Sequence, residues 1–467
     1  MTGLLIRGAE VAGRGSADVR VADGRVTEVG PGLLRAAGEP VVEARGGALL
    51  PGLSDSHLHL TALAAAGTSV PCGPPAVRDV HALSAALGGA AGDAHGWVRG
   101  VGYFESVAGD LDATGLDRLH PARPVRVQHR SGALWILNTA GVDGLGLASA
   151  DHPGIERSAD GTPTGRLWRA DDWLRSRLPP PPAPDMAAVG ARLCALGITA
   201  VTDATPDLDD DALALIAAAV DRGDLPQRVQ LLGAPLHRRA PGPRLAVGPY
   251  KIVLADSGLP DLDSLVDRIG AVHGAGRSVA VHCVSREALV LLVAAVRVCG
   301  VRPGDRIEHA ALVPRELLPE LATSGLRVVT QPGFLTARGD DFLADVPAGD
   351  HSDLYRCRSL LDAGVPVALS SDAPFGPLDP WTVLAAALDR RTPSGAIAGA
   401  PERIPFDVAL DGYLAEPTDP GGTPRRVVPG LAADLVLLDR PFTDMAAEPV
   451  AGAVRAVLIG GAVLTDR

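Results

Sequence analysis

The chain has 467 residues, of which 46% are hydrophobic and 21% charged, a composition typical of a well-buried globular protein. At roughly 150 residues per domain, this length predicts two or three units, and a barrel with a small extra domain fits equally well. The formal net charge of -12 argues against a nucleic-acid or anionic-membrane partner. The first residues lack the basic start and apolar run of a signal peptide, and no stretch is long and apolar enough to cross a bilayer.

The five cysteines are scattered along the chain, odd in number and without a CxxC pair. This usage predicts free, mostly buried thiols and a reducing cytoplasmic location. A homodimer is the oligomeric state that we consider, although nothing in the sequence requires it.

Both ends of the chain are rich in short predicted strands. Asp23-Gly24 suits a two-residue hairpin turn, because both positions tolerate positive φ. Near the other end, residues 433–438 form an apolar strand, and a later strand pair turns at Gly460-Gly461. We therefore expect residues 1–50 and 405–467 to form one small β-sandwich domain, which ties down both termini.

The middle of the chain, residues 51–404, alternates short apolar runs with helical patterns, which predicts parallel β/α units. The predicted strands are Ala48–Leu53, Ile198–Asp203, Arg228–Leu232, Tyr250–Leu254, Ser278–Val284, Asp305–His309, Arg327–Gln331 and Val365–Ser371. Eight strands with helices between them is the count of a (β/α)8 TIM-like barrel. Periodicity alone does not separate a closed barrel from an open sheet, but candidate ligands spread over five strand ends favour the barrel.

A long segment, residues 67–186, follows the first of these strands. It contains an extended run at 125–129 and ends in a proline-rich stretch. Because it is too long for a plain loop, we expect an inserted lid or subdomain with structure of its own.

The first candidate metal ligands are His57 and His59. Alternate residues of a strand point to the same face, so these two imidazoles project together and form a chelate suited to zinc. His282 and His309 each end an apolar strand, where a single histidine would more often be a hydrogen-bonded core residue. Asp372 follows the eighth strand, which neighbours the first in a closed barrel, so it can bind metal and also accept a proton.

Lys251 is the single lysine among the 43 basic residues, and it lies on the fourth barrel strand. Burial lowers the pKa of an amine, and a neutral amine can react with carbon dioxide to give a carbamate that bridges two metal ions. Arginine cannot replace it, since its guanidinium stays protonated. The alternative is a lysine whose stem is buried while its amine reaches solvent at the rim.

These residues suggest two divalent ions, with zinc expected. One would be held by His57, His59 and Asp372, and the other by His282 and His309, with carbamylated Lys251 shared. A metal-bound hydroxide would attack the substrate, with Asp372 as the catalytic proton shuttle.

Five further residues are candidates for supporting roles. Asp55 has the strand parity of the two histidines and could orient one of them, or stabilise a turn instead. The candidates for substrate contact are Asn138, Asp203, Gln331 and His129.

This order of ligands along the strands resembles the metal-dependent amidohydrolase superfamily over the whole chain. Several segments are similar to its branch of N-substituted formamide deformylases: Pro51–His59, Pro124–Asn138, Gly197–Asp203, Arg306–Ala310, Gln331-Pro332, Ser371–Pro374 and Gly430–Asp439. The chain departs from that branch in three places. Ser285-Arg286 stands near where a Gly-Asp pair is usual, Ala133 where a histidine is expected, and Arg169 near an expected acidic residue.

The sequence thus predicts a metal-dependent hydrolase of carbon–nitrogen bonds other than peptide bonds, acting on a small amide, formamide or cyclic amide. Two alternatives keep the superfamily: a mononuclear deaminase that uses His57, His59, His282 and Asp372, with His309 polarising the water, and a lactone or ester hydrolase. A third alternative is a metal-free binding module.

Overall fold

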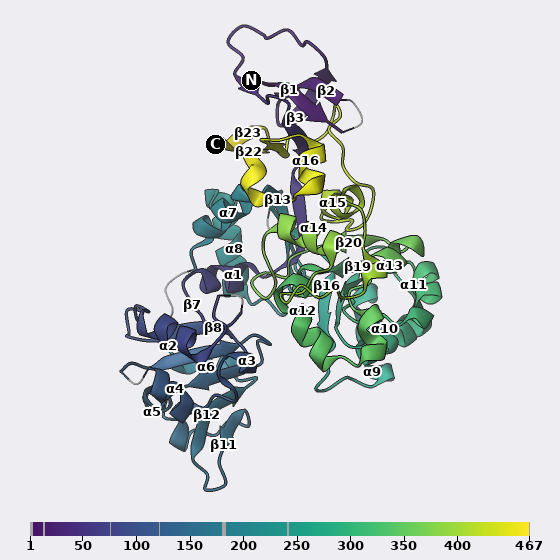
Figure 1. Cartoon of the computed structure of the whole chain (residues 1–467). Helices are drawn as coiled ribbons and strands as arrows, with labels where there is room; N and C mark the ends of the chain where they lie inside the picture. The colour runs from purple at the N-terminus through teal and green to yellow at the C-terminus, as the bar shows by residue number, and fades with distance from the viewer. Residues whose placement is uncertain are drawn as a thin grey trace. The chain divides into compact units, whose positions relative to one another are not determined.

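The computed structural model describes residues 3–12, 15–74, 76–120, 122–179, 184–240 and 242–466. The chain divides into two compact units, which are described separately below (Figure 1). The first unit comprises Met1–Thr61 and Met186–Arg467, and the second comprises Ala62–Asp185. Within the described ranges, no helix is long and apolar enough to cross a membrane.

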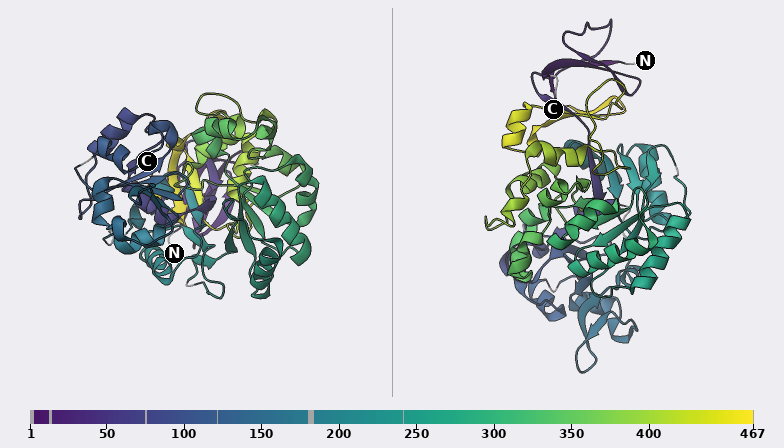
Figure 2. Two further views of the ribbon diagram at one scale, coloured as in Figure 1. Left: turned by 90° about the horizontal axis from the view of Figure 1, so that it is seen from below. Right: turned by 90° about the vertical axis from the view of Figure 1, so that its right-hand side faces the viewer.

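Strands from both termini share one eight-stranded sheet in the first unit. They are β1 (Leu4–Val11), β2 (Gly15–Ala22), β3 (Arg25–Gly30), β4 (Val41–Glu43), β5 (Ala48–Pro51), β21 (Leu435–Leu438), β22 (Val454–Ile459) and β23 (Ala462–Asp466). Antiparallel pairing of β5 with β21 joins the two ends of the chain, which lie side by side in Figures 1 and 2. The predicted turn is confirmed, because Asp23 and Gly24 have φ of 51° and 72° and connect β2 to β3.

The strands that carry the candidate ligands form two parallel sheets. One has the order β15-β14-β13-β6 and the other β16-β17-β18-β19-β20. Their bounds are β6 (Leu53–Leu58), β13 (Ile198–Asp203), β14 (Arg228–Leu231), β15 (Leu245–Val247), β16 (Tyr250–Val253), β17 (Val279–Cys283), β18 (Arg306–His309), β19 (Arg327–Thr330) and β20 (Val367–Leu369). Backbone hydrogen bonds join the sheets at two places, from Lys251 N to Leu232 O (3.1 Å) and from Asp372 N to His57 O (2.8 Å).

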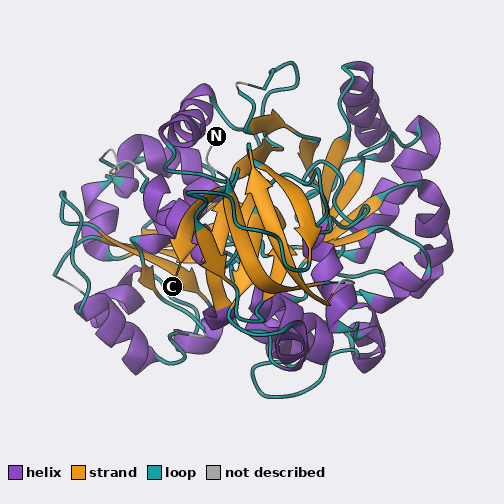
Figure 3. Ribbon diagram, turned by 90° about the horizontal axis from the view of Figure 1, so that it is seen from above, coloured by secondary structure: helices purple, strands orange, loops and turns teal. Residues whose placement is uncertain are grey.

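Helices alternate with these strands and lie outside them (Figure 3). They are α7 (Met186–Ala195), α8 (Asp210–Arg222), α9 (Leu262–Gly274), α10 (Arg286–Cys299), α11 (Leu318–Ser324), α12 (Gly333–Asp345), α13 (Arg358–Asp362), α14 (Pro380–Asp389) and α15 (Phe406–Leu414). The sequence determines where α9 begins, because the Asp261 side chain caps the helix by accepting a hydrogen bond from Ser264 N at 2.8 Å. Leu265, Ile269 and Val272, which follow one another at helical spacing, are buried.

The predicted strand 48–53 is in fact two strands that belong to different sheets. Residues 48–51 form β5 of the terminal sheet, whereas β6 begins at Leu53 and pairs with β13. The break falls at Gly52, where a Cβ would lie 2.1 Å from Thr199 Oγ1. Only glycine allows this approach, and a continuous apolar run hides the break from a periodicity argument.

The second unit has its own six-stranded sheet, in the order β11-β12-β10-β9-β8-β7. The strands are β7 (Val70–Pro71), β8 (Val98–Tyr103), β9 (Val125–His129), β10 (Leu134–Leu137), β11 (Ile155–Arg157) and β12 (Pro163–Trp168). The helices are α2 (Val80–Gly88), α3 (Glu105–Ala108), α4 (Ala113–Leu119), α5 (Thr139–Gly144) and α6 (Asp171–Arg177). Two clusters of buried apolar side chains give this unit a core of its own.

Candidate metal centre

The six predicted ligands lie in or just beyond parallel strands of the first unit. His57 is in β6, Lys251 in β16 and His282 in β17, and His309 ends β18. His59 follows β6, and Asp372 follows β20. Because the ends of parallel strands meet at one edge, residues far apart in sequence converge there.

His57, His59 and Asp372 form a group whose ligand atoms all lie within 4.8 Å of one another. His59 Nε2 is 3.2 Å from Asp372 Oδ1, and His57 Nε2 is 3.5 Å from the same oxygen. His57 Nε2 and Asp372 Oδ1 are buried and have no hydrogen-bond partner among the described residues. Buried polar atoms are normally satisfied, so two unpartnered atoms that lie 3.5 Å apart suit coordination of a cation.

Glu308 fixes the orientation of His57. One carboxylate oxygen of Glu308 contacts His57 Nδ1, and the other accepts from Arg306 Nε at 2.5 Å. All three side chains are buried. With a proton on Nδ1 directed at Glu308, the Nε2 lone pair of His57 is left for a metal.

Glu308 and Arg306 were not predicted as site residues. The signal was present in the sequence, because Arg306 and Glu308 lie on either side of the apolar Ile307 in a strand that was predicted to belong to the barrel core. Two buried charges in one strand require partners, and they would point to the same face.

Polar side chains also hold the imidazoles of His59 and His309. His59 Nδ1 is 3.1 Å from Thr205 Oγ1. His309 Nδ1 is 2.9 Å from Gln331 Oε1, and Gln331 Nε2 donates to Ser370 Oγ at 2.9 Å. Gln331, a predicted substrate contact, is fully buried and uses its amide to position His309.

His282, His309 and Lys251 lie beside the three-residue group. The ring centroids of His282 and His309 are 4.4 Å apart, and those of His57 and His309 are 4.7 Å apart. Lys251 is buried, with 4% of its surface exposed. Among the histidines, cysteines and carboxylates of the described residues, only His57, His59 and Asp372 form a group of three whose ligand atoms all lie within 4.8 Å of one another.

Burial favours the neutral forms of His57, His282, His309 and Lys251. Desolvation lowers the pKa of His282 to about 2 and that of His309 to about 3, although the carboxylate of Asp372 opposes the shift of the His309 pKa. Desolvation also lowers the pKa of Lys251. Burial alone would raise the pKa of Asp372, but the neighbouring histidines outweigh it and the pKa is lowered. Neutral imidazoles beside a carboxylate are the protonation states that bind metal.

Two of the candidate ligands have backbone in the left-handed region. His309 has φ of 72° and Asp372 has φ of 54°, a conformation that only a few per cent of non-glycine residues adopt. Such conformations are concentrated at functional sites, where the surrounding structure maintains them.

Asp55 and Asp203 accept hydrogen bonds from backbone N–H groups, although the second carboxylate oxygen of Asp55, Oδ2, is buried with no hydrogen-bond partner among the described residues. Asp55 accepts from His57 N (3.1 Å) and Ser371 N (3.2 Å), which links β6 to the segment after β20. Asp203 accepts from Leu60 N (2.7 Å) and Thr205 N (3.1 Å). These carboxylates therefore shape the ends of the strands; the imidazoles are held by other groups, and Asp203 is fully buried.

The other two predicted contacts, Asn138 and His129, lie in the second unit. Asn138 accepts from Val125 N and Gly141 N (2.9 Å each) and donates to His120 O and Arg123 O (3.0 and 2.7 Å). This uses its side-chain amide fully, so Asn138 caps α5 and has no remaining capacity for a substrate. His129 lies between two polar groups, with its Nδ1 2.7 Å from Ser131 Oγ and its Nε2 3.2 Å from Glu105.

The residues at which the chain departs from the formamide deformylase branch have local structural roles. Ser285 caps α10 by accepting from Ala288 N at 3.1 Å. Arg286 forms ion pairs with Asp350 and Asp353 at 2.8 and 2.9 Å. Arg169 N donates to Ala133 O at 2.8 Å.

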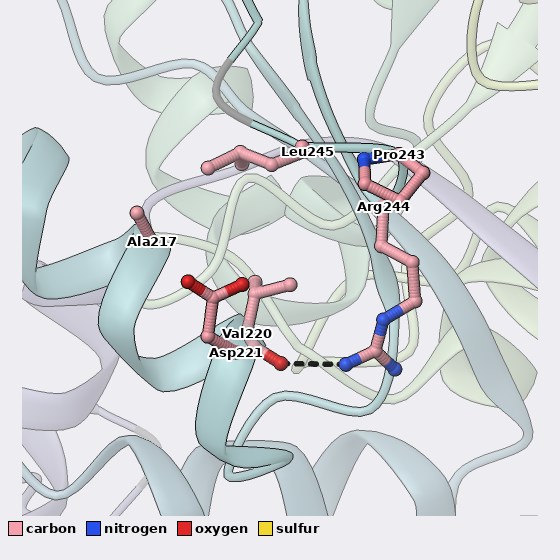
Figure 4. Close-up of a pocket in the computed structure, with 7 residues that line it drawn as sticks. Ala217, Val220, Asp221, Pro243, Arg244 and Leu245 are labelled. Carbon is pink, nitrogen blue, oxygen red and sulfur yellow. Dashed lines mark hydrogen bonds between the residues drawn. The ribbon is translucent and has the colours of Figure 1, made fainter.

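A separate pocket of about 260 Å³ lies between α8 and the segment before β15 (Figure 4). Arg244 and Asp221 line it, but Arg244 donates to the backbone oxygens of Val220 and Pro226. None of the predicted site residues lines this pocket. Its one guanidinium is already engaged with carbonyls, so we assign it no function.

Comparison with known proteins agrees with this geometry. The sequence profile described as "Amidohydrolase family" matches residues 40–465. The chain is 27% identical to N-substituted formamide deformylase of Arthrobacter pascens, over 92% of this chain and 91% of that protein. Its fold is similar to an uncharacterized metal-dependent hydrolase of Pyrococcus horikoshii (TM-score 0.74, 19% identity, 94% and 98% of the two chains). It is also similar to N-isopropylammelide isopropylaminohydrolase of Burkholderia multivorans (TM-score 0.54, 20% identity, 99% and 98%).

The first unit is thus a parallel α/β core with histidines and an aspartate gathered at its strand ends, where they form a candidate site for a divalent metal. The chain belongs to the amidohydrolase family, and the predicted resemblance is confirmed. The protein is therefore an enzyme of the hydrolase class that acts on carbon–nitrogen bonds.

Proposed function

We propose that the protein hydrolyses a carbon–nitrogen bond of a small amide, formamide or cyclic amide at the centre formed by His57, His59 and Asp372. The convergence of three ligand atoms, two of them buried without partners, carries the proposal. Among amides, we favour N-substituted formamides, because that class names the substrate of the Arthrobacter relative.

The donor set suits one divalent ion, with zinc preferred. Neutral imidazole nitrogens and a carboxylate oxygen are ligands that zinc binds well. When bound, the ion would supply a Lewis acid that lowers the pKa of water and polarises the scissile carbonyl. The contact of Glu308 with Nδ1 of His57 supports this, because it reserves Nε2 for the ion.

Asp372 would act as the proton shuttle. Its pKa is lowered, so its carboxylate is ionised and able to accept a proton from the attacking water. Asp372 would then deliver this proton to the leaving nitrogen. The fixed position of Asp372, held by its backbone bond to His57 O, favours the transfer.

A second ion would be held by His282, His309 and carbamylated Lys251. For this to occur, the neutral amine of Lys251 adds to carbon dioxide, forming an N–C bond and releasing a proton. The burial and lowered pKa of Lys251 support the reaction.

We also propose an architecture of three parts: a barrel, a terminal β-sandwich and an inserted subdomain. The hydrogen bonds that join the two parallel sheets support a closed (β/α)8 barrel within residues 51–404. Shared pairing of terminal strands supports a terminal β-sandwich from residues 1–50 and 405–467. The separate core of the second unit supports an inserted subdomain at about 67–186, which we propose as a lid. Five free cysteines support a cytoplasmic location.

One alternative is favoured by a specific observation. Only His57, His59 and Asp372 form a compact three-ligand group in the described part of the chain. That arrangement also suits a mononuclear deaminase, in which His282 would add a ligand and His309 would polarise the water. The lactone or ester hydrolase differs only in the bond attacked.

A hydrolysis screen tests the proposal. Metal-loaded protein would be incubated with formamides, cyclic amides, N-acyl amino acids, lactones and aminated heterocycles, with amine, ammonia and acid release measured. We expect turnover of an amide. Ammonia release from heterocycles alone would favour the deaminase, and turnover of lactones alone would overturn the carbon–nitrogen assignment.

A further inference from the structure

Two arginines lie side by side on one face of the six-stranded sheet in the second unit. Arg99 in β8 and Arg126 in β9 are register partners in neighbouring parallel strands, so their side chains leave the sheet on the same face. Trp135 in β10 shares that face, and both guanidinium carbons are 5.5 Å from the centroid of its ring. Because like charges directly opposite each other destabilise a sheet, this arrangement requires a counter-charge.

Both guanidiniums are partly buried, and neither has a carboxylate partner in the described part of the chain. Arg126 forms no hydrogen bond or ion pair with any described residue, and its Nε is buried. Arg99 reaches only neutral oxygens, since its Nη1 donates to Ala65 O at 3.0 Å and to Ser69 Oγ. A charged donor that has lost water without gaining an acceptor is costly, so the unused donors of Arg126 point to a missing acceptor.

The carboxylates near this pair are engaged elsewhere. Asp171 Oδ1 accepts from Trp135 Nε1 at 2.8 Å. Asp93 Oδ1 accepts from two backbone N–H groups of its own loop, at 2.8 and 2.9 Å. Burial lowers the pKa of Arg126, and the charge of Asp93 opposes this shift only in part. Burial also lowers the pKa of Arg99 to about 10, with the charge of Arg126 adding to the effect, so both guanidiniums stay charged at neutral pH.

We propose that Arg99 and Arg126 form a binding site for a small oxyanion, a phosphate or a carboxylate, on the second unit. Two guanidiniums side by side present planar sets of N–H donors, which match the oxygens of such a group. The ring of Trp135 attracts both cations without neutralising them, because a cation–π contact carries no opposite charge. A bound oxyanion would supply both the counter-charge and the acceptor that Arg126 lacks. The site uses none of the candidate metal ligands, so the inference goes beyond the proposed function.

Calorimetric titration of the full chain tests the site. The probes are sodium phosphate and sodium acetate, with sodium chloride at matched ionic strength as the reference. We expect saturable binding of at least one oxyanion and none of chloride, and the phosphate and acetate arms decide which oxyanion the site takes. Absence of saturable binding in both arms would overturn the inference.

Substitution of one arginine tests which residues hold the oxyanion. Arg126→Met should raise the Kd about tenfold or more, because charge-assisted hydrogen bonds are lost. Arg126→Lys, which keeps the charge but loses the planar donors, should raise the Kd less. The control is Arg123→Met, which removes an exposed arginine just before β9 that donates to Ala90 O at 3.2 Å. A Kd that is equal in wild type and Arg126→Met would contradict the proposal.

Urea unfolding followed by tryptophan fluorescence separates a binding site from a purely structural arginine pair. In Tris chloride buffer, Arg126→Met should unfold at the same urea concentration as wild type or a higher one, because the repulsion with Arg99 is removed. A saturating oxyanion should raise the midpoint of wild type more than that of Arg126→Met, since it binds only the folded site. A midpoint for Arg126→Met that is lower by the same amount with and without oxyanion, or a variant that does not fold, would show a structural role and refute the inference.

Discussion

Glu308 connects His57 to Arg306 in the interior of the first unit. We expect Glu308→Gln to weaken divalent-metal affinity about 10- to 100-fold, because an amide no longer orients and polarises the imidazole. Affinity would be measured by competition with a chromophoric chelator. The control is Glu320→Gln, which alters a carboxylate paired with Arg297 at the surface. A purely structural role for Glu308 would lower the melting temperature and leave the metal affinity per folded molecule unchanged.

Lys251 provides a second test at the scale of single residues. If its carbamate bridges two ions, Lys251→Arg should lose one ion per chain and most activity while the fold is retained, since a guanidinium forms no carbamate. Metal content by mass spectrometry, activity and circular dichroism would be compared with wild type. Normal turnover by this variant would contradict the bridging role.

Asp372 should be the most sensitive single position. Asp372→Asn removes the proton acceptor and one ligand atom, so we expect kcat to fall by about a thousandfold or more. The far-ultraviolet circular dichroism spectrum should match that of wild type. Retention of more than a tenth of the activity would exclude Asp372 as the shuttle.

Much of this centre could be predicted from the sequence, because its ligands follow recognisable strands. What could not be predicted is how the remaining polar groups are distributed. Gln331 and Asp203 are polar residues at strand ends, a position equally suited to contacting a substrate or a backbone amide. Only the three-dimensional partners decide between these roles, and here they are His309 and backbone N–H groups.

At the scale of elements, Asn138 ties α5 to β9. Asn138→Ala should destabilise the second unit by about 2–4 kcal/mol, because a helix cap is lost and buried backbone groups lose their partners. Four of the five tryptophans lie in this unit, so urea unfolding followed by tryptophan fluorescence reports on it. The matched control, Asp112→Ala, removes a single capping bond to Gly115 at 2.7 Å and should cost about 1 kcal/mol. Equal effects of the two substitutions would contradict this account.

The elements also show that hydrophobic periodicity predicts the strands but does not predict all of their boundaries. All eight predicted segments contain a strand, and most of them are short apolar runs between helical patterns. The boundary at Gly52 was missed, since it depends on the approach of Thr199 from β13, which is 147 residues away in the chain. Contacts of this kind leave no local pattern.

At the scale of the whole molecule, the chain ends converge in one sheet, and residues 62–185 form a separate unit. The predicted insertion at 67–186 was placed from segment length and composition. Its function as a lid stays a prediction, and Ala133 and Arg169 lie within it. All six predicted ligands lie in or just beyond the parallel strands of the first unit, so the central claim concerns this unit.

Metal removal and restoration test that claim most directly. Purified protein would be analysed for metal by mass spectrometry, stripped with a chelator, reloaded with zinc and assayed for formamide hydrolysis at each stage. The account predicts at least one ion per chain, loss of hydrolysis on stripping and recovery on reloading, with His57→Ala failing to recover. Protein that holds no ion and hydrolyses its substrate undiminished in chelator would contradict it.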